Sequence, residues 1–230
     1  MQPVASIEVL GEHGPLGADY LASLAVIPLI AQKTHTYYAP TVPYGDTLEL
    51  PSRGGSVHIP TSVLSEYYKA IVSSYAKSET LKQFYFLNFH SLNAFSIDTI
   101  SRSFSTKDFR IYSIDWYKCV AQGAKDILTD PDGMGHGGEM VTSVLLYLNE
   151  KIVDMKSENN EAPYSHFSYY KDHLPRSSSP LQVYGSFSDY TNNSSWGPLC
   201  GASKEKGKVL VERAIALVVQ LIQETLEIPH

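Results

Sequence analysis

The stretch Phe84-Tyr85-Phe86-Leu87-Asn88-Phe89-His90 decides the fold of this chain. Its first four residues form an uncharged apolar run, which is typical of a strand buried on both faces. The run leads directly into polar Asn88 and His90, and a helix is expected to begin near Asn93. A buried strand followed by a helix is the unit of a parallel sheet with helices on both faces.

The same alternation continues on both sides of this stretch. Strands are expected over residues 4–7, 37–42 and 110–116, and helices over residues 19–33, 61–76, from 93, 138–150 and 203–226. This order predicts an α/β fold of three layers, α/β/α, with a central, mainly parallel sheet. Residues 1–230 are expected to form a single domain. Residues 157–200 are rich in Ser, Asn, Tyr and Pro and predict a long surface excursion.

Composition excludes several classes of protein. The net charge is −6 and the lysines are scattered, so no basic stripe is available to bind nucleic acid. The apolar run over residues 21–30 is too short to cross a bilayer and contains Pro28. Acidic residues precede it, where a signal peptide needs basic ones. The two cysteines form no CxxC pair. We therefore expect a cytoplasmic protein with no membrane partner.

Three separated segments place a carboxylate or a histidine beside glycines. They are residues 8–19, 88–93 and 135–140. Glu8 and His90 each follow an expected strand, and ligands of such sheets bind beyond the carboxyl ends of the strands. Carboxylate oxygens and imidazole nitrogens are common ligands of divalent metal ions. The three segments together predict one hydrolytic metal site.

The same segments resemble the motifs of the creatininase family (creatinine amidohydrolase and relatives). The first family motif, Glu-x-His-Gly-Pro-His-x-Pro-x-Gly-x-Asp, matches Glu8, Gly11, His13, Pro15, Gly17 and Asp19. The second, Asn-Gly-His-x-x-Asn, matches Asn88, His90 and Asn93. The third, Gly-His-Ala-Gly-Glu-x-x-Thr-Ser, matches Gly135, His136, Gly138, Glu139, Thr142 and Ser143. The order of the motifs along the chain is that of the family.

This resemblance implies a creatininase-like fold, usually assembled as a hexamer, and a set of site residues. The motif residues that hold the first metal ion correspond to Glu8, Asp19 and His90. Those that lie in the substrate pocket correspond to His136 and Glu139. Family members open cyclic amides, cleave other small amide bonds, or hydrolyse related sugar-derived substrates. The partners implied are a small-molecule substrate and further copies of the chain.

The chain departs from the family at two polar positions. Leu10 replaces the first histidine of the first motif, and Leu92 replaces a residue that is a metal-binding glutamate in some members. Leucine cannot bind a metal ion, so one Zn, Mn or Fe ion per chain is expected instead of two. Alternatively, a shifted register brings His13 to the place of the missing ligand, at the cost of the Glu8-to-Asp19 spacing. Phe89 adds bulk near the site, which makes creatinine itself an unexpected substrate.

Several roles stay open at this point. His136 is either the acid or base of the reaction or an ordinary loop histidine. Glu139 either activates water or favours the start of a helix, and Asp19 is either a ligand or a helix cap. His13 and Ser56 are expected to line the substrate pocket.

The leading functional prediction is a metal-dependent hydrolase of a small, cyclic amide C–N bond. A non-catalytic binding or assembly subunit is one alternative. A metal-assisted lyase, isomerase or condensing enzyme of a biosynthetic pathway is another.

Overall fold

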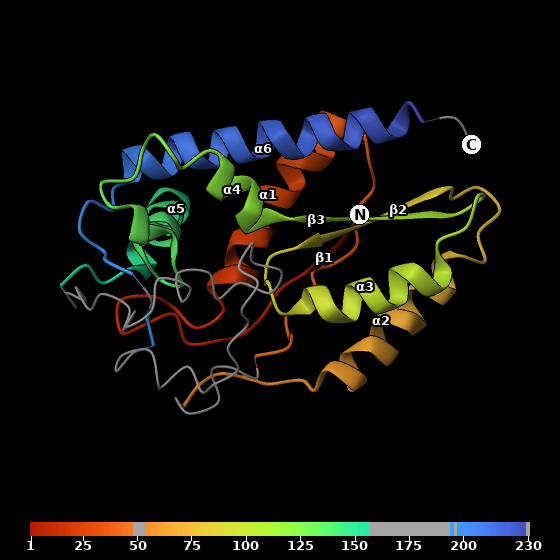
Figure 1. The fold of residues 1–230 in the computed structure, drawn as a ribbon, viewed down its shortest axis with the longest axis horizontal. Coiled ribbons are helices and arrows are strands. Elements are labelled where there is room, and N and C mark those ends of the chain that lie inside the picture. Colours follow the sequence, from red (N-terminus) through yellow and green to blue (C-terminus); the bar gives the residue numbers. More distant parts are fainter. Residues whose placement is uncertain (48–53, 157–193, 196, 229–230) are drawn as a thin grey trace.

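The structure is a computed structural model that describes residues 1–47, 54–156, 194–195 and 197–228 (Figure 1). Its strands are β1 (Gln2–Val4), β2 (Gln83–Asn88) and β3 (Arg110–Asp115). Its α-helices are α1 (Ala18–Thr34), α2 (Thr61–Tyr75), α3 (Asn93–Phe104), α4 (Trp116–Gln122), α5 (Glu139–Asn149) and α6 (Lys204–Leu226). Two 3₁₀ turns, η1 (Pro131–Met134) and η2 (Glu150–Ile152), flank α5. No helix of the described residues has the length and apolar character needed to cross a membrane.

The strands form a parallel sheet in the order β1-β2-β3. Its register places Val4 beside Asn88 and Asn88 beside Asp115, so the described strands end level with one another. The three-layer α/β/α fold with a parallel sheet is confirmed. The chain segments that leave β1, β2 and β3 therefore start from one edge of the sheet.

The alternation of β2 side chains builds one core on each face of the sheet. Tyr85 and Leu87 pack into a cluster formed with α1, α4, α5 and α6. Phe84 and Phe86 pack into a second cluster formed with α2 and α3. Figure 1 shows the two groups of helices on opposite sides of the strands. Burial on both faces explains why β2 reads as a continuous apolar run.

Some local predictions were wrong. Residues 37–42 form no strand, and only Val42 makes a bridge to Val4 of β1. β1 ends at Val4, the first residue of the strand expected over residues 4–7, and α4 was not predicted. Most of the predicted excursion over residues 157–200 lies outside the described residues. Both cysteines are free thiols; Cys119 is buried and Cys200 is exposed.

Candidate metal centre

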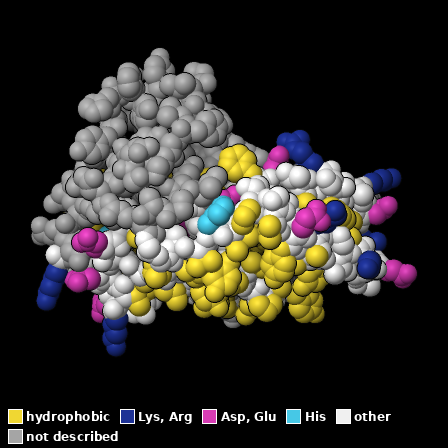
Figure 2. Space-filling view, turned by 90° about the horizontal axis from the view of Figure 1, so that it is seen from below, with side chains coloured by type: hydrophobic (Ala, Val, Ile, Leu, Met, Phe, Trp, Pro, Cys, Tyr) yellow, Lys and Arg dark blue, Asp and Glu magenta, His cyan; other side chains and the backbone are white. Residues whose placement is uncertain are grey.

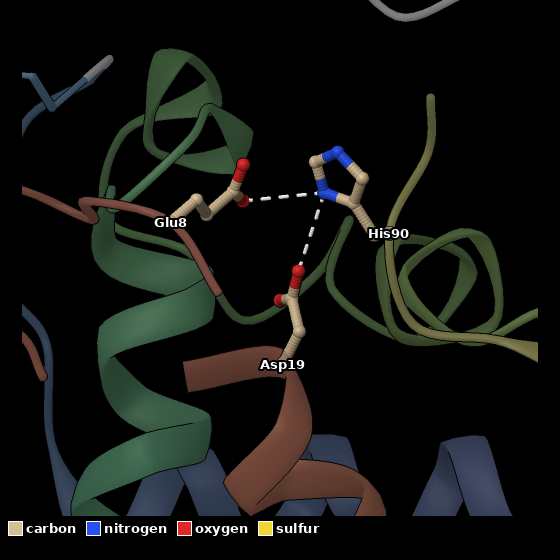
Figure 3. A group of neighbouring side chains, drawn as sticks. All are labelled: Glu8, Asp19 and His90. Carbon is tan, nitrogen blue, oxygen red and sulfur yellow. Dashed lines mark ion pairs between the residues drawn. The ribbon is translucent and has the colours of Figure 1, made fainter. Parts of the chain in front are cut away.

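Glu8, Asp19 and His90 meet at the carboxyl edge of the sheet (Figure 3). Glu8 lies beyond the end of β1, Asp19 lies in the first turn of α1, and His90 follows β2. One donor atom from each side chain lies within 4.8 Å of the other two, and all three residues are buried. The sheet thus brings together the three residues for which the sequence predicted metal binding.

The two asparagines of the second motif hold the backbone around this cluster. The Asn88 side-chain oxygen accepts a hydrogen bond from the His90 amide at 3.1 Å. Asn93 donates to the Ala5 carbonyl at 3.0 Å and accepts from the Asp46 amide at 3.1 Å. Asn93 therefore ties together the segment that leads to Glu8 and the segment that contacts His90.

Asp19 is a member of the cluster and does not cap its helix. The cap position of α1 is Gly17, whose φ of 74° lies in the left-handed region that favours glycine. Asp19 is the second helical residue, where the helix dipole stabilises a negative charge. Its Oδ2 atom accepts a hydrogen bond from the Ser6 hydroxyl at 2.9 Å. The same oxygen lies 3.3 Å from Nδ1 of His90.

A backbone contact fixes the orientation of the His90 ring. Its Nε2 atom donates to the Asp46 carbonyl at 2.6 Å, because a carbonyl oxygen can only accept. Nδ1 therefore faces Glu8 Oε1 at 3.2 Å and Asp19 Oδ2 at 3.3 Å. In a neutral imidazole, this arrangement leaves the Nδ1 lone pair directed at the carboxylates. A carbonyl that holds the outer nitrogen is the usual support of a metal-binding histidine.

The charges of the cluster are strongly linked. Burial opposes a charge on His90, but Glu8 and Asp19 outweigh it and hold the His90 pKa well above its usual value. Burial alone would raise the Glu8 pKa, and His90 with His136 lowers it below its usual value. Burial, together with nearby Glu8, raises the Asp19 pKa. Two buried carboxylates side by side are stable only when a proton or another positive charge lies between them.

The residues fit a divalent ion. Three electron-rich atoms, two carboxylate oxygens and Nδ1, converge on one point, which is unfavourable unless a proton or a metal ion lies among them. The second carboxylate oxygen of Glu8 is buried and has no hydrogen-bond partner among the described residues. A two-carboxylate, one-imidazole donor set suits Zn, Mn or Fe.

His136 lies beside the cluster. Its Nδ1 atom is 3.7 Å from Glu8 Oε1, and its Nε2 atom donates to the Val9 carbonyl at 2.8 Å. The ring therefore has the same arrangement as His90, with Nε2 on a carbonyl and Nδ1 toward Glu8. Its side chain is about one-fifth exposed, so it is more accessible than the three central residues. This position suits a group that exchanges protons with a bound molecule.

Glu139 occupies a different environment. Its carboxylate is fully buried and accepts hydrogen bonds from the backbone amides of Thr129 and Asp130. It also pairs with the Lys206 ammonium at 2.5 Å. These contacts attach the start of α5 to the preceding loop and to α6. They suit a structural carboxylate better than the base predicted from the sequence.

The remaining predicted site residues lie around the cluster. Ser56 accepts a hydrogen bond from the Val9 amide at 3.1 Å, which fixes the segment after Glu8. His13 is 1% exposed, and its Nε2 atom bonds to Thr142 at 3.0 Å. The structure therefore gives no support to a register in which His13 replaces the ligand missing at Leu10. Leu10 is buried in the apolar cluster that includes residues of α1, and Leu92 is also buried.

The sequence did not point to Asp115 or Tyr117. Asp115 ends β3, caps α4 through the Lys118 amide, and interacts electrostatically with His90. The Tyr117 hydroxyl is buried and interacts with Asp19 and Glu8. The available signal was position, because Asp115 is the last residue of the strand next to β2 and Tyr117 follows that strand.

Known proteins resemble this chain in sequence and in fold. The family model for creatininase (creatinine amidohydrolase) matches residues 1–222. A creatininase variant described as Zn-Zn type is 20% identical with a TM-score of 0.79, over 99% of this chain and 90% of that one. A creatinine amidohydrolase structure is 19% identical with a TM-score of 0.79, over 100% of this chain and 90% of that one. A putative creatinine amidohydrolase from Bacteroides fragilis is 18% identical with a TM-score of 0.75, over 99% and 88%.

No curated protein matches the sequence. The structures, at 18–20% identity, share the fold, and the family model covers nearly the whole chain. The chain belongs to the creatininase family.

Proposed function

We propose that this protein is a metal-dependent hydrolase that opens a C–N bond of a small, cyclic amide. The observation that carries the proposal is the convergence of Glu8, Asp19 and His90 on one point, buried at the carboxyl edge of the sheet. Membership of the creatininase family supports the same reaction class. Other creatininase structures are described as Zn-Zn type or as the Mn form, which supports a divalent ion here.

In this reaction, three residues bind the metal ion and a fourth transfers the proton. Glu8, Asp19 and His90 would hold one Zn, Mn or Fe ion, which would supply Lewis-acid polarisation of the amide carbonyl and would lower the pKa of a bound water to about 7. His136 takes the proton of the attacking water at Nδ1 and passes it to the leaving nitrogen. The Val9 carbonyl holds the other ring nitrogen and so orients the base.

We expect one ion per chain. The second-ion ligand of the family motif is replaced by Leu10, which packs into the apolar core, and Leu92 adds no donor. Three protein ligands and an open position are sufficient for hydrolytic metal catalysis. Because Phe89 and Leu92 also replace smaller or polar residues of the motif, a small and partly apolar substrate is expected.

Metal analysis with a matched pair of variants tests the proposal. Glu8→Gln and Glu139→Gln each neutralise one buried carboxylate, but only Glu8 faces His90. We expect about one ion per wild-type chain, loss of the ion in Glu8→Gln, and retention in Glu139→Gln. His136→Gln is expected to keep the ion and to lose 10²- to 10⁴-fold of the rate on a panel of cyclic amides. Equal metal content in all four proteins would reject the site.

The buried leucines also favour a second candidate function, a binding or assembly subunit without catalysis. This candidate predicts that the purified protein contains no stoichiometric metal and turns over no amide. A non-hydrolytic reaction predicts bound metal with products that lack added water. Metal content and product mass therefore separate the three possibilities.

The proposal includes assembly into a homo-oligomer, with a hexamer as the expected size. Large side chains are exposed on the α1–α2 connection and at the start of α2, namely Tyr37, Tyr38, Tyr44, Val63 and Tyr67. The Ile59 amide donates to the Gly45 carbonyl, which places Tyr44 near the start of α2. Figure 2 shows a broad apolar area on one face of the molecule. Such an area supports an interface between copies of the chain.

A further inference from the structure

Asp46 lies outside the three sequence motifs, yet it contacts the proposed metal-binding histidine. Its carbonyl accepts a hydrogen bond from Nε2 of His90 at 2.6 Å, and its amide donates to the Asn93 side chain at 3.1 Å. Asp46 itself lies in neither a helix nor a strand, so no regular hydrogen-bond ladder fixes the direction of its carbonyl. Its side chain is therefore the place to look for a further restraint.

The Asp46 carboxylate is held by Thr61. Asp46 is 3% exposed, and the Thr61 hydroxyl donates to its Oδ2 atom at 2.5 Å. Nδ1 of His58 lies 3.5 Å from the other oxygen, Oδ1, without a hydrogen bond. A buried carboxylate is costly unless donors compensate it, and a hydrogen bond to a carboxylate is about twice as strong as one between neutral groups. Thr61 thus anchors the far end of the Asp46 side chain.

Thr61 is itself attached to α3, and this attachment closes a ring of contacts. Thr61 is the first residue of α2, and its carbonyl accepts from the Ser96 hydroxyl at 3.1 Å. Ser96 is buried on α3, three residues after Asn93, whose amide donates to the His90 carbonyl at 3.1 Å. The ring therefore runs from His90 to Asp46, then to Thr61 and Ser96, and back along α3 to His90.

This ring restrains the nitrogen that faces the ion. If the Asp46 carbonyl moves, Nε2 of His90 loses its acceptor, and the imidazole can turn about χ2, a torsion with a broad energy profile. Such a rotation turns Nδ1 away from Glu8 and Asp19, which now lie at 3.2 and 3.3 Å. Groups that orient a metal-binding histidine are a recurrent support of metal sites. The Asp46 carboxylate can therefore affect metal binding without contacting the ion.

We propose that Asp46 is a positioning residue of the metal centre, whose carboxylate, held by the Thr61 hydroxyl, keeps the Asp46 carbonyl where it orients His90. The inference rests on the proposed function, because it assumes that His90 is a metal ligand. It extends the site to the start of α2, and it assigns to Asp46 and Thr61 an effect on metal affinity, separate from any contact with substrate.

The test removes the Thr61 hydroxyl and keeps the shape of the side chain. Thr61→Val takes this donor from Asp46, whereas Thr61→Ser keeps it, and Asp46→Ala removes the carboxylate but not the backbone carbonyl. Thr99→Val is the matched control, because Thr99 is also an exposed helical threonine, and its hydroxyl donates to the Phe95 carbonyl within α3. Dissociation constants for Zn²⁺ are measured by competition with a chelating dye, and the Co²⁺ absorption spectrum reports ligand geometry.

We expect Thr61→Val and Asp46→Ala to bind Zn²⁺ about 10- to 100-fold more weakly than wild type and to change the Co²⁺ spectrum. Thr61→Ser and Thr99→Val are expected to match wild type in both. Thermal unfolding of the metal-free proteins checks that the variants fold, and the Thr61 pair decides the result if Asp46→Ala does not.

The possible failures are distinguishable. Equal Zn²⁺ affinity of Thr61→Val and wild type, or equal weakening in Thr61→Val and either Thr61→Ser or Thr99→Val, would overturn the positioning role alone. A wild-type protein that binds neither ion would overturn the proposed function, and this inference with it.

Discussion

At His90, one hydrogen bond decides which ring nitrogen faces the carboxylates of the candidate metal centre. The Asp46 carbonyl holds Nε2, so Nδ1 is directed at Glu8 and Asp19. The two carboxylates favour a proton on Nδ1, and the same negative charges favour a metal cation there. A proton and a metal ion therefore compete for the same position.

This competition predicts a pH dependence of metal binding. Because the His90 pKa is raised well above its usual value, the ion must displace a proton at neutral pH. We expect the Zn²⁺ association constant to rise about tenfold per pH unit up to the raised pKa, and to level off above it. Calorimetry in buffers of different ionisation enthalpy counts the released protons. An affinity that stays constant between pH 6 and pH 9 would contradict this mechanism.

His13 is expected to make the folded state sensitive to acid. Thr142 donates to the Gly137 carbonyl, so His13 Nε2 donates to Thr142 and the buried Nδ1 has no partner among the described residues. Burial, followed by the charge of His136, lowers the His13 pKa to about 4. As the pH falls from about 6.5 to about 4, the unfolded chain gains a proton that the folded chain does not. This difference removes about 3 kcal/mol of stability.

Urea unfolding with excess chelator measures this effect. The free energy of unfolding of wild type should fall more steeply between pH 7 and pH 4 than that of His13→Gln, which keeps a donor for Thr142. Parallel curves for the two proteins would show that His13 does not titrate in this range.

At the scale of the elements, the strand predictions held both for β2, which is buried on both faces, and for β3, which is largely half-buried. The runs at Phe84–Leu87 and Arg110–Trp116 correspond to β2 and β3 within one residue or two. The Tyr37–Val42 pattern was misleading, because its large side chains point to the surface and its backbone bridges β1 once. Helix α2 was placed correctly, yet it buries Leu64, Tyr68 and Val72, whereas Val63 and Tyr67 are exposed.

The candidate site was predictable only where its residues stand in sequence motifs. Glu8, Asp19 and His90 stand in motifs with fixed spacing, and they come together. The ion pair of Glu139 with Lys206 and the electrostatic interaction of Tyr117 with Asp19 join residues far apart in sequence. Such contacts depend on how α4, α5 and α6 pack, which no local pattern records.

Gly45 links the elements around the site. A Cβ atom at this position would lie 2.4 Å from the Asn93 side-chain oxygen and 2.6 Å from the Ala5 carbonyl. Gly45→Ala therefore forces apart the segments that hold Glu8 and His90. We expect a loss of about 1–3 kcal/mol in the free energy of unfolding, with weaker Zn²⁺ binding.

Gly54→Ala is the matched control, because a Cβ atom there meets nothing within 4 Å. Chemical denaturation and Zn²⁺ titration of the two variants compare the positions directly. If Gly45→Ala were as stable and bound Zn²⁺ as tightly as Gly54→Ala, the close packing around Asn93 would not support the site.

At the scale of the whole molecule, the exposed side chains predict assembly. Tyr37, Tyr38, Tyr44, Val63 and Tyr67 are between 47% and 95% exposed. Together they offer roughly 500 Å² of surface, more than half of one partner's share of a standard interface. Size-exclusion chromatography with light scattering should give a multiple of the 25.5 kDa chain, with six copies expected.

Two substitutions locate the interface. Tyr67→Glu is expected to dissociate the assembly, because it places a charge in the apolar area. Leu226→Glu, at an exposed position near the end of α6, is expected to leave the mass unchanged. A monomeric wild type, or an assembly that survives Tyr67→Glu, would rule out this surface as the contact.

The central claim is that Glu8, Asp19 and His90 together hold one metal ion. An anomalous-scattering map, recorded at the zinc absorption edge from crystals grown with Zn²⁺, tests it most directly. The account predicts one strong peak per chain, bonded to a carboxylate oxygen of Glu8, a carboxylate oxygen of Asp19 and Nδ1 of His90. A map without a peak among these three side chains would contradict it.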